Sequence, residues 1–141
     1  MLIYQANQGG VRTMQISELR KKFNDLIELR QKYEKIIVNR DVLLEGVYRE
    51  FYKTCGRKDC HCVTTGEKHG PYHKIEVSRN GKQKVFIVPK GKVSKVIELD
   101  NNRKQFIKAE EKIKKINEEI YEIIKEIKKQ KEKRVDKRWL A

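Results

Sequence analysis

The chain has 141 residues, of which 38% are hydrophobic and 38% are charged, and its 34 Lys and Arg against 20 Asp and Glu give a net charge of +14. This balance excludes a large hydrophobic core, so a cross-link or helix pairing must contribute to stability. No apolar run approaches the ~20 residues that a membrane-spanning helix needs. We therefore expect a soluble, cytoplasmic protein without a membrane partner.

The basic charge is concentrated in the middle of the chain. Residues 46–99 contain 12 basic and 5 acidic side chains, whereas residues 1–45 contain 8 and 6. A field of this sign favours a polyanionic partner, because bound cations replace the counterions condensed on phosphates. Nucleic acid is therefore the first candidate partner.

The N-terminal part predicts an arm followed by one helix. Residues 1–14 show no period and include Gly9-Gly10, which is typical of a flexible arm. In residues 15–45, with Ser17 as the expected cap, apolar side chains recur at steps of three and four, as on one face of a helix. These side chains are Ile16, Leu19, Phe23, Leu26, Leu29, Tyr33, Ile36 and Ile37.

Residues 46–90 change to the alternating pattern of strands. Gly46–Lys53, Tyr72–Arg79 and Lys84–Val88 alternate, and Asn80-Gly81 joins the last two runs. Asn-Gly between alternating runs is the strongest short signal for a hairpin. The segment predicts three antiparallel strands, with a long connection between the first and the second.

That connection has the spacing of metal ligands at Cys55, Cys60, Cys62 and His69. Three thiolates and one imidazole are the donors of a closed tetrahedral zinc site, so Zn²⁺ is the expected cofactor. Two alternatives stay open: free thiols in a polar turn, or a disulfide, which an odd number of cysteines leaves incomplete. His61 is an alternative fourth ligand, but it lies between two cysteines, where we expect its ring to point away from the metal.

Residues 91–141 predict a long helix from about Lys92 to Arg138, with Asp100-Asn101-Asn102 as the one candidate break. Its apolar side chains alternate steps of three and four, as in the heptad seam of a coiled coil. A lone amphipathic helix of this length cannot cover its own isoleucines, so it must pair. The expected seam contains Ala109 and, as its main positions, Phe106, Ile113, Ile116, Ile120, Ile123 and Ile127.

Together the four segments predict an α+β fold. It would be an antiparallel helical hairpin or coiled coil with a small three-stranded antiparallel zinc-binding β module at its tip. Three strands are marginally stable alone, and a metal on the longest loop would fix their register. We expect a homodimer, or pairing with another helical partner, through the uncovered part of the seam.

The connection reads Cys55-Gly56-Arg57-Lys58-Asp59-Cys60-His61-Cys62 and continues with Gly66-Glu67-Lys68-His69-Gly70-Pro71-Tyr72. This sequence resembles an uncharacterised family of small bacterial and archaeal proteins, in which a Cys-Gly-Lys-Pro-x-Cys-x-Cys box precedes His-Gly-Pro-Tyr, a hairpin and a helical tail. The resemblance covers roughly Gly46 to Pro89. It implies that the three cysteines and His69 act as one unit, and it implies no activity. Lys58 stands where the family often has proline, so the turn is expected to be less rigid.

The same residues argue against catalysis. A catalytic zinc keeps one coordination position open for water and needs a general base, whereas four protein ligands close the sphere. Glu67 is the one acid able to serve, and the acid of a His-x-Glu helix, expected one residue beyond a ligand histidine, is missing. The gaps between the cysteines also differ from the two-residue gap of thiol redox sites. We expect no enzymatic activity and no catalytic residues.

We expect cations near the metal loop and the hairpin to contact nucleic acid. Alternation places Lys74 on the same face as Tyr72, so that one side of the sheet combines charge with an aromatic ring. The expected binding residues are Arg57, Lys58, Lys68, Lys74, Arg79, Lys82 and Lys84. The aromatic side chains interpreted as sheet core are Tyr48, Phe51, Tyr52, Tyr72 and Phe86.

Two functions fit these features. The first is a zinc-stabilised, non-enzymatic nucleic-acid-binding protein, with DNA favoured over RNA and duplex DNA as the first choice. The alternative is a protein-interaction adaptor that uses the coiled coil and the zinc knob to dock on a larger nucleic-acid-processing complex. A continuous basic face favours the first function, and a large uncovered isoleucine stripe favours the second.

Overall fold

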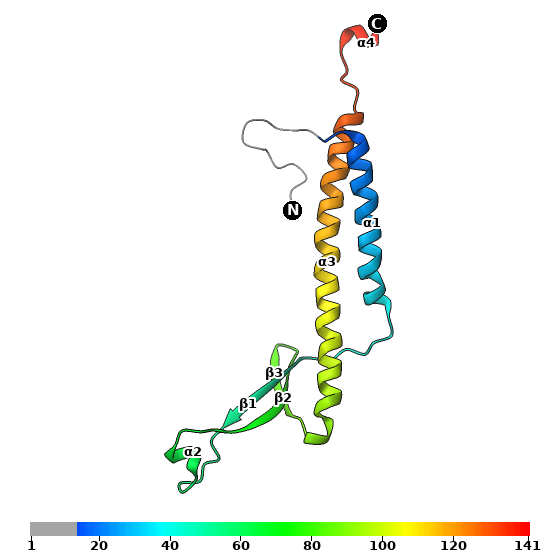
Figure 1. The fold of residues 1–141 in the computed structure, drawn as a ribbon. Coiled ribbons are helices and arrows are strands. Elements are labelled where there is room, and N and C mark those ends of the chain that lie inside the picture. Colours follow the sequence, from blue (N-terminus) through cyan, green and yellow to red (C-terminus); the bar gives the residue numbers. More distant parts are fainter. Residues whose placement is uncertain (1–13) are drawn as a thin grey trace. The chain divides into compact units, whose positions relative to one another are not determined.

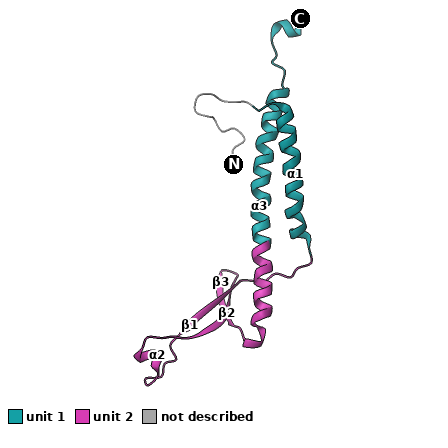
Figure 2. Ribbon diagram, in the orientation of Figure 1, with its two compact units in different colours: residues 1–39, 106–141 teal, residues 40–105 magenta. Residues whose placement is uncertain are grey.

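The computed structural model describes residues 14–141, which fall into two compact units (Figure 1, Figure 2). Unit 1 holds the residues up to Asn39 and Phe106–Ala141, and unit 2 holds Arg40–Gln105. The chain combines helices with one three-stranded antiparallel sheet, which confirms the predicted mixture of elements. The expected N-terminal arm, apart from Met14, lies outside the described residues.

Unit 1 contains two helices that lie side by side in Figure 1, α1 (Ile16–Val38) and the C-terminal part of α3 (Val93–Lys131). Their three-and-four spacing collects the apolar side chains on one face of each helix. The buried members form one hydrophobic cluster of Leu19, Leu26, Ile116, Ile120 and Ile123. Burial of these side chains is therefore what holds the pair together.

The positions expected to form the seam differ in burial along α3. Ile116, Ile120 and Ile123 belong to the hydrophobic cluster and Ala109 is buried, whereas Phe106, Ile113 and Ile127 are half-buried. On the same helix Tyr121 and Ile124 keep 61% and 46% of their surface exposed. Two helices thus cover the centre of the stripe and leave its margins to solvent. Among residues 14–141 no helix combines the length and apolar character that a membrane crossing requires.

The helix ends differ from those predicted. α1 begins directly after Gln15, so the prediction that Ser17 caps it was wrong. α3 ends at Lys131 instead of continuing towards Arg138, and the short helix α4 (Lys137–Leu140) follows. Asp136 starts α4, because its carboxylate accepts a hydrogen bond from the backbone N–H of Trp139 at 2.9 Å. This cap begins a separate helical turn within the range where the sequence had predicted one continuous helix.

The sheet of unit 2 contains β1 (Val47–Lys53), β2 (His69–Arg79) and β3 (Lys82–Ile87) in the order β1-β2-β3, so the three predicted antiparallel strands are confirmed. The β2–β3 hairpin turns at Asn80-Gly81, where φ is +52° and +75°. Both values suit the two-residue turn for which Asn-Gly is the preferred sequence.

The inner face of the sheet, defined by the buried Val77, carries a polar pair as well. Tyr48 Oη lies 2.6 Å from His73 Nδ1, and the two rings stack with centroids 5.9 Å apart. The prediction that all the aromatic side chains form core was wrong: Tyr72 lies on the face opposite to Val77, and Phe86 stays exposed although it shares the face of Val77. The exposed fractions of Tyr52, Tyr72 and Phe86 are 54%, 36% and 43%.

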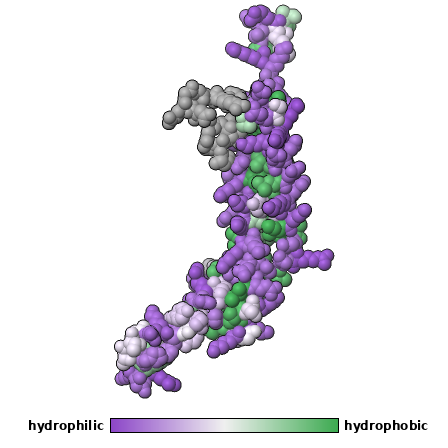
Figure 3. All heavy atoms as spheres, in the orientation of Figure 1, coloured by the Kyte–Doolittle hydropathy of each residue, from purple (hydrophilic) through white to green (hydrophobic). Residues whose placement is uncertain are grey.

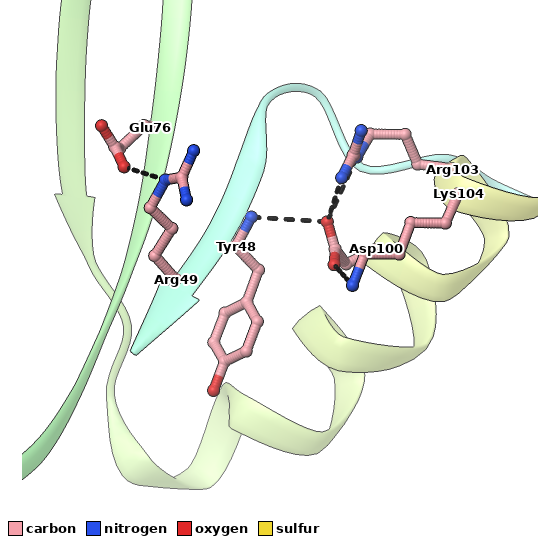
Figure 4. A network of polar contacts seen from close by, with 6 residues as sticks. All are labelled: Tyr48, Arg49, Glu76, Asp100, Arg103 and Lys104. Carbon is pink, nitrogen blue, oxygen red and sulfur yellow. Dashed lines mark hydrogen bonds and ion pairs between the residues drawn. The ribbon is translucent and has the colours of Figure 1, made fainter. Parts of the chain in front are cut away.

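α3 follows the short helix η1 (Lys90–Lys92) and continues through Asp100-Asn101-Asn102, so the candidate break is not one. Asp100 is only 2% exposed. Its carboxylate accepts hydrogen bonds from Arg103 at 2.9 Å and from the backbone N–H of Tyr48 at 3.4 Å, and Lys104 pairs with its other oxygen at 3.2 Å (Figure 4). The buried carboxylate is stable because two cations and a backbone N–H group surround it.

Two further hydrogen bonds attach the segment before β1 to the same stretch of α3. The backbone N–H of Leu44 donates to the carbonyl of Leu99 at 3.1 Å, and the Asn102 side chain donates to the carbonyl of Val42 at 3.0 Å. The polar cluster therefore positions the sheet on α3 within unit 2.

Candidate metal centre

β2 reaches the cysteine loop because its first residues approach β1 closely. The pairing of the two strands shifts between Phe51 and Lys53, so that Lys53 lies opposite His69. At Gly70 φ is +148°, and a Cβ there would lie 2.6 Å from the Tyr52 ring and 3.0 Å from the carbonyl oxygen of Phe51. Only glycine fits this approach. The Gly70 position thus brings the His69 imidazole to the end of β1, where the cysteine loop begins.

Cys60 and Cys62 are brought together by a single helical turn, α2 (His61–Thr64), which Cys60 precedes as the N-cap residue. The carbonyl of His61 accepts hydrogen bonds from the hydroxyls of Thr64 and Thr65 at 3.2 and 2.6 Å. It also accepts the Thr65 backbone N–H at 2.7 Å. These local bonds close the turn without any core of its own and leave Cys62 2% exposed.

The four predicted ligands lie together. The donor atoms of Cys55, Cys60, Cys62 and His69 all lie within 4.8 Å of one another. Cys55 Sγ is 3.6 Å from Cys62 Sγ, and Cys60 Sγ is 3.2 Å from His69 Nε2. For Zn–S bonds of about 2.3 Å, the sulfur atoms of a tetrahedral site lie about 3.8 Å apart. The group therefore has the donor set and nearly the size that a tetrahedral metal ion requires, and it could bind one.

The two histidines of the loop differ in their relation to this group. His69 contributes Nε2 to the cluster of four donor atoms, whereas His61 is not one of its members. His61 nevertheless lies close, with Nδ1 3.7 Å from Cys60 Sγ and its ring edge-on to that of His69 at 5.3 Å. The structure thus brings together the set that includes His69, with His61 beside it.

The thiols differ in their readiness to ionise. A backbone hydrogen bond with Arg57 and the Cys60 thiol lower the pKa of Cys55 to about 7. At Cys62 a backbone hydrogen bond with Cys55 also lowers the pKa, but burial and the neighbouring thiols outweigh it and the pKa is raised. Thiolates are the metal-binding form, and a divalent cation among them would offset both the burial and their mutual repulsion.

The cations predicted to bind nucleic acid fall into two groups. Arg57, Lys58 and Lys68 are exposed beside the cysteines, Lys82 and Lys84 are exposed on β3, and Figure 3 shows a mainly hydrophilic surface around α2. Within residues 14–141 none of these five forms an ion pair.

The other two predicted cations are engaged within unit 2. The guanidinium of Arg79 donates to both carboxylate oxygens of Glu45, from Nη2 at 2.5 Å and from Nε at 3.0 Å, and lies 5.6 Å from the Phe86 ring centroid. The Lys74 ammonium lies 5.2 Å from the ring centroid of Phe51. Arg79 is therefore a structural ion-pair partner in this fold, whereas Lys74 is joined to an aromatic side chain.

Two features near the site were missed in the sequence. Lys53 places its ammonium 4.9 Å from the ring centroid of Tyr72, and Arg49 pairs with Glu76 at 2.5 Å (Figure 4). Both cations lie on β1. The alternation of that strand could have indicated which face of the sheet carries Arg49. The shifted pairing at the end of β1, which brings Lys53 to Tyr72, has no local sequence signal.

Comparison with known proteins places the chain in a family without giving it a function. No curated protein and no solved structure matches it. A protein-family model matches residues 16–98, more than half of the chain, and this range includes α1, the sheet and all four residues of the Cys/His group. The expectation of an uncharacterised family is confirmed: the chain belongs to DUF6788, described as a domain of unknown function.

Proposed function

We propose that this protein is a zinc-stabilised, non-enzymatic nucleic-acid-binding protein that favours DNA over RNA. The observation that carries the proposal is the set of exposed cations around the Cys/His group. Arg57 and Lys58 lie in the turn between Cys55 and Cys60, and Lys68 directly precedes His69. None of these three cations has an ion-pair partner among residues 14–141, so their charge is available to phosphates.

Zinc would act here as a structural ion. With Cys55, Cys60, Cys62 and His69 as ligands, its tetrahedral sphere would be complete and would leave no position for a reacting water. Glu67 is exposed and is not a member of the donor cluster. The metal would hold the loop in one conformation, so that its cations are positioned before a polyanion arrives. Three thiolates need a reducing compartment, so we place the protein in the cytoplasm.

The hairpin extends the proposed contact surface beyond the loop. Lys82 and Lys84 are exposed on β3, and their side chains could follow a phosphate backbone that begins at the metal loop. Arg79 is assigned less weight because its guanidinium already binds Glu45. The helices of unit 1 would form a coiled coil that pairs two copies of the chain and sets the distance between two binding sites.

A salt titration tests this function. Fluorescence anisotropy of labelled DNA with the metal-loaded chain should give an affinity that falls steeply with salt, because each neutralised phosphate contributes about 0.9 to the slope on duplex DNA. The variant Arg57→Gln/Lys58→Gln should bind more weakly and with a smaller slope. The matched control Lys112→Gln, an exposed lysine of α3, should bind as the native chain does. Failure to bind any nucleic acid at about 50 mM salt would refute the proposal.

One observation favours the adaptor as a second candidate. Unit 1 has a groove of about 320 Å³ that is mainly apolar and is lined by Arg20, Phe23, Asn24, Ile124 and Ile127. An apolar groove between two helices can receive a helix of another polypeptide. If the protein is an adaptor, substitution of Ile124 would abolish co-purification of the polypeptide that occupies the groove. The variant Arg57→Gln/Lys58→Gln would leave this co-purification unchanged.

A further inference from the structure

The outer face of the sheet in unit 2 carries cations and apolar side chains together. We define this outer face as the positions that alternate with the inner Val77, and the strand register sets their neighbours. Phe51 lies opposite Tyr72, and Lys74 lies opposite both Arg49 and Ile87. A row of two aromatic side chains therefore lies next to a row that contains two cations.

This face is open to solvent, although it is not composed like a solvated face. Ile87, Val85 and Tyr72 keep 65%, 53% and 36% of their surface exposed. An antiparallel sheet with one face in water normally presents polar side chains there. The face includes one acid, Glu76, which is bound by Arg49 at 2.5 Å and by Gln83 at 3.1 Å. Its remaining cations, Lys53 and Lys74, have no acidic partner among residues 14–141.

Two aromatic rings and two ammonium groups form the centre of the face. The ring centroids of Phe51 and Tyr72 are 5.5 Å apart with planes tilted by 35°. The Lys74 ammonium lies 5.2 Å from the Phe51 centroid, and the Lys53 ammonium lies 4.9 Å from the Tyr72 centroid. Each ring therefore has a flexible lysine over it, which can move aside and leave a flat surface beside a positive charge.

We propose that the outer face binds single-stranded DNA, with an unpaired base stacked on Tyr72 and the adjoining phosphates held by Lys53 and Lys74. The inference rests on the proposed function, and it specifies that the nucleic acid is single-stranded. A base offers a flat ring and its backbone offers phosphates, which together match the two kinds of group on this face. Duplex DNA keeps its bases paired inside the helix, so the aromatic rings add nothing to its binding. This assignment replaces duplex DNA, which was the first choice of polymer from the sequence.

The test measures stacking separately from charge. An oligothymidylate of about 20 nucleotides with one central 2-aminopurine is titrated with the metal-loaded full chain, in parallel with its duplex and with the matching RNA. Binding of the single strand should quench the 2-aminopurine fluorescence, and it should be tighter than binding of the duplex. Tyr72→Leu should lower single-strand affinity by about tenfold and abolish the quenching. Tyr72→Phe should retain both.

Further variants separate the effect of charge on binding from any effect of a substitution on folding. Lys74→Gln should reduce the salt slope for the single strand by about 0.7, whereas Tyr72→Leu should leave that slope unchanged. Tyr121→Leu changes an exposed tyrosine of α3 and should bind as the native chain does. The metal content of each variant shows whether its loop has folded. If Tyr72→Leu fails to fold, the quenching by the native chain and by Lys74→Gln still decides the question.

The outcomes separate this inference from the proposed function. Unchanged single-strand affinity of folded Tyr72→Leu, absence of quenching, or tighter binding of the duplex overturns the stacking site. If Arg57→Gln/Lys58→Gln still weakens binding in that case, the proposed function stands. Tighter binding of the RNA than of the DNA overturns the assignment to DNA. Failure to bind any of the three polymers overturns both proposals.

Discussion

Unit 1 and unit 2 are stabilised by different physics although they share the helix α3. Unit 1 buries a cluster of five large aliphatic side chains, and burial of each contributes about 1.5–3 kcal/mol. Among the described residues, unit 2 buries only Cys62, Val77 and Val88 as hydrophobic side chains. It adds the buried Asp100 network and the Cys/His group. In unit 2 the ion pairs, together with any metal ion that the Cys/His group binds, would take the place of a large core.

This difference predicts that the two units respond separately to metal and to loss of apolar volume. A perturbation of the ligands should affect unit 2 and leave the helices of unit 1 intact. Loss of a buried isoleucine should do the reverse. The expected effects below run from the largest to the smallest.

Removal of the metal is expected to have the largest effect, because metal-binding energy in small sites of this kind is folding energy. Chelation of the metal-loaded chain should release about one ion per chain and abolish amide protection over residues 54–72. The far-UV circular dichroism of the helices should change little. Hydrogen exchange followed by mass spectrometry measures both regions in one experiment.

A pair of histidine variants sharpens this prediction. His69→Ala should lose the metal, since Nε2 of His69 belongs to the donor cluster, whereas His61→Ala should retain it. Retention of a full complement of metal by His69→Ala would contradict the assignment of the fourth ligand. Loss of helix on chelation would show that unit 1 depends on the metal as well.

Ile123→Ala is expected to destabilise unit 1 by about 2–5 kcal/mol, because Ile123 is fully buried and the cavity would be only partly refilled. The neighbouring Ile124→Ala is the matched control, since Ile124 is 46% exposed and should cost much less. Chemical denaturation followed by circular dichroism gives both free energies of unfolding. Equal costs for the two variants would show that the helices do not pack through this face.

Asp100→Asn is expected to destabilise unit 2 by about 2 kcal/mol, because the neutral amide loses charge-assisted bonds to Arg103 and Lys104 in a buried place. The control Glu98→Gln breaks an exposed pair with Lys95, which should contribute less than about 1 kcal/mol. Exchange rates of the Tyr48 and Leu44 amides report the opening of this region. If both variants leave those rates unchanged, Asp100 does not position the sheet.

Local signals account for the part of the fold and site that the sequence predicted. The Asn80-Gly81 turn, the strand alternation and the ligand spacing each lie within a short stretch of chain. The structure brings the four ligands together because one helical turn and Gly70 position them. Zinc itself stays a prediction, as does any contact with nucleic acid.

The sequence did not reveal the contacts that join distant residues. Asp100, interpreted from sequence as part of a helix break, is instead held by Tyr48 far back in the chain. Arg79 also has a distant partner, the carboxylate of Glu45, and its expected contact with nucleic acid stays a prediction. In each case the residue type was recognised as polar, but its partner depends on tertiary structure that no local pattern encodes.

The smallest expected effect is the pH dependence of the Asp100 network. Burial alone would raise the pKa of Asp100, but hydrogen bonds from Arg103 and Lys104 outweigh it and hold the pKa below the ordinary value of 3.8. A carboxyl with a lowered folded-state pKa stabilises the protein above its unfolded pKa, and this contribution is lost as the pH falls through the folded pKa. The stability difference between the native chain and Asp100→Asn should therefore be constant near neutrality and shrink below about pH 4.

Urea denaturation of both chains at neutral pH and near pH 3 measures this difference. The Cys/His group is the same in both chains, so its contribution cancels when the two are compared. A stability difference that persists unchanged in acid would mean that Asp100→Asn acts through packing rather than through charge. In that case unit 2 would depend on side-chain packing, as unit 1 does, more than its small apolar core suggests.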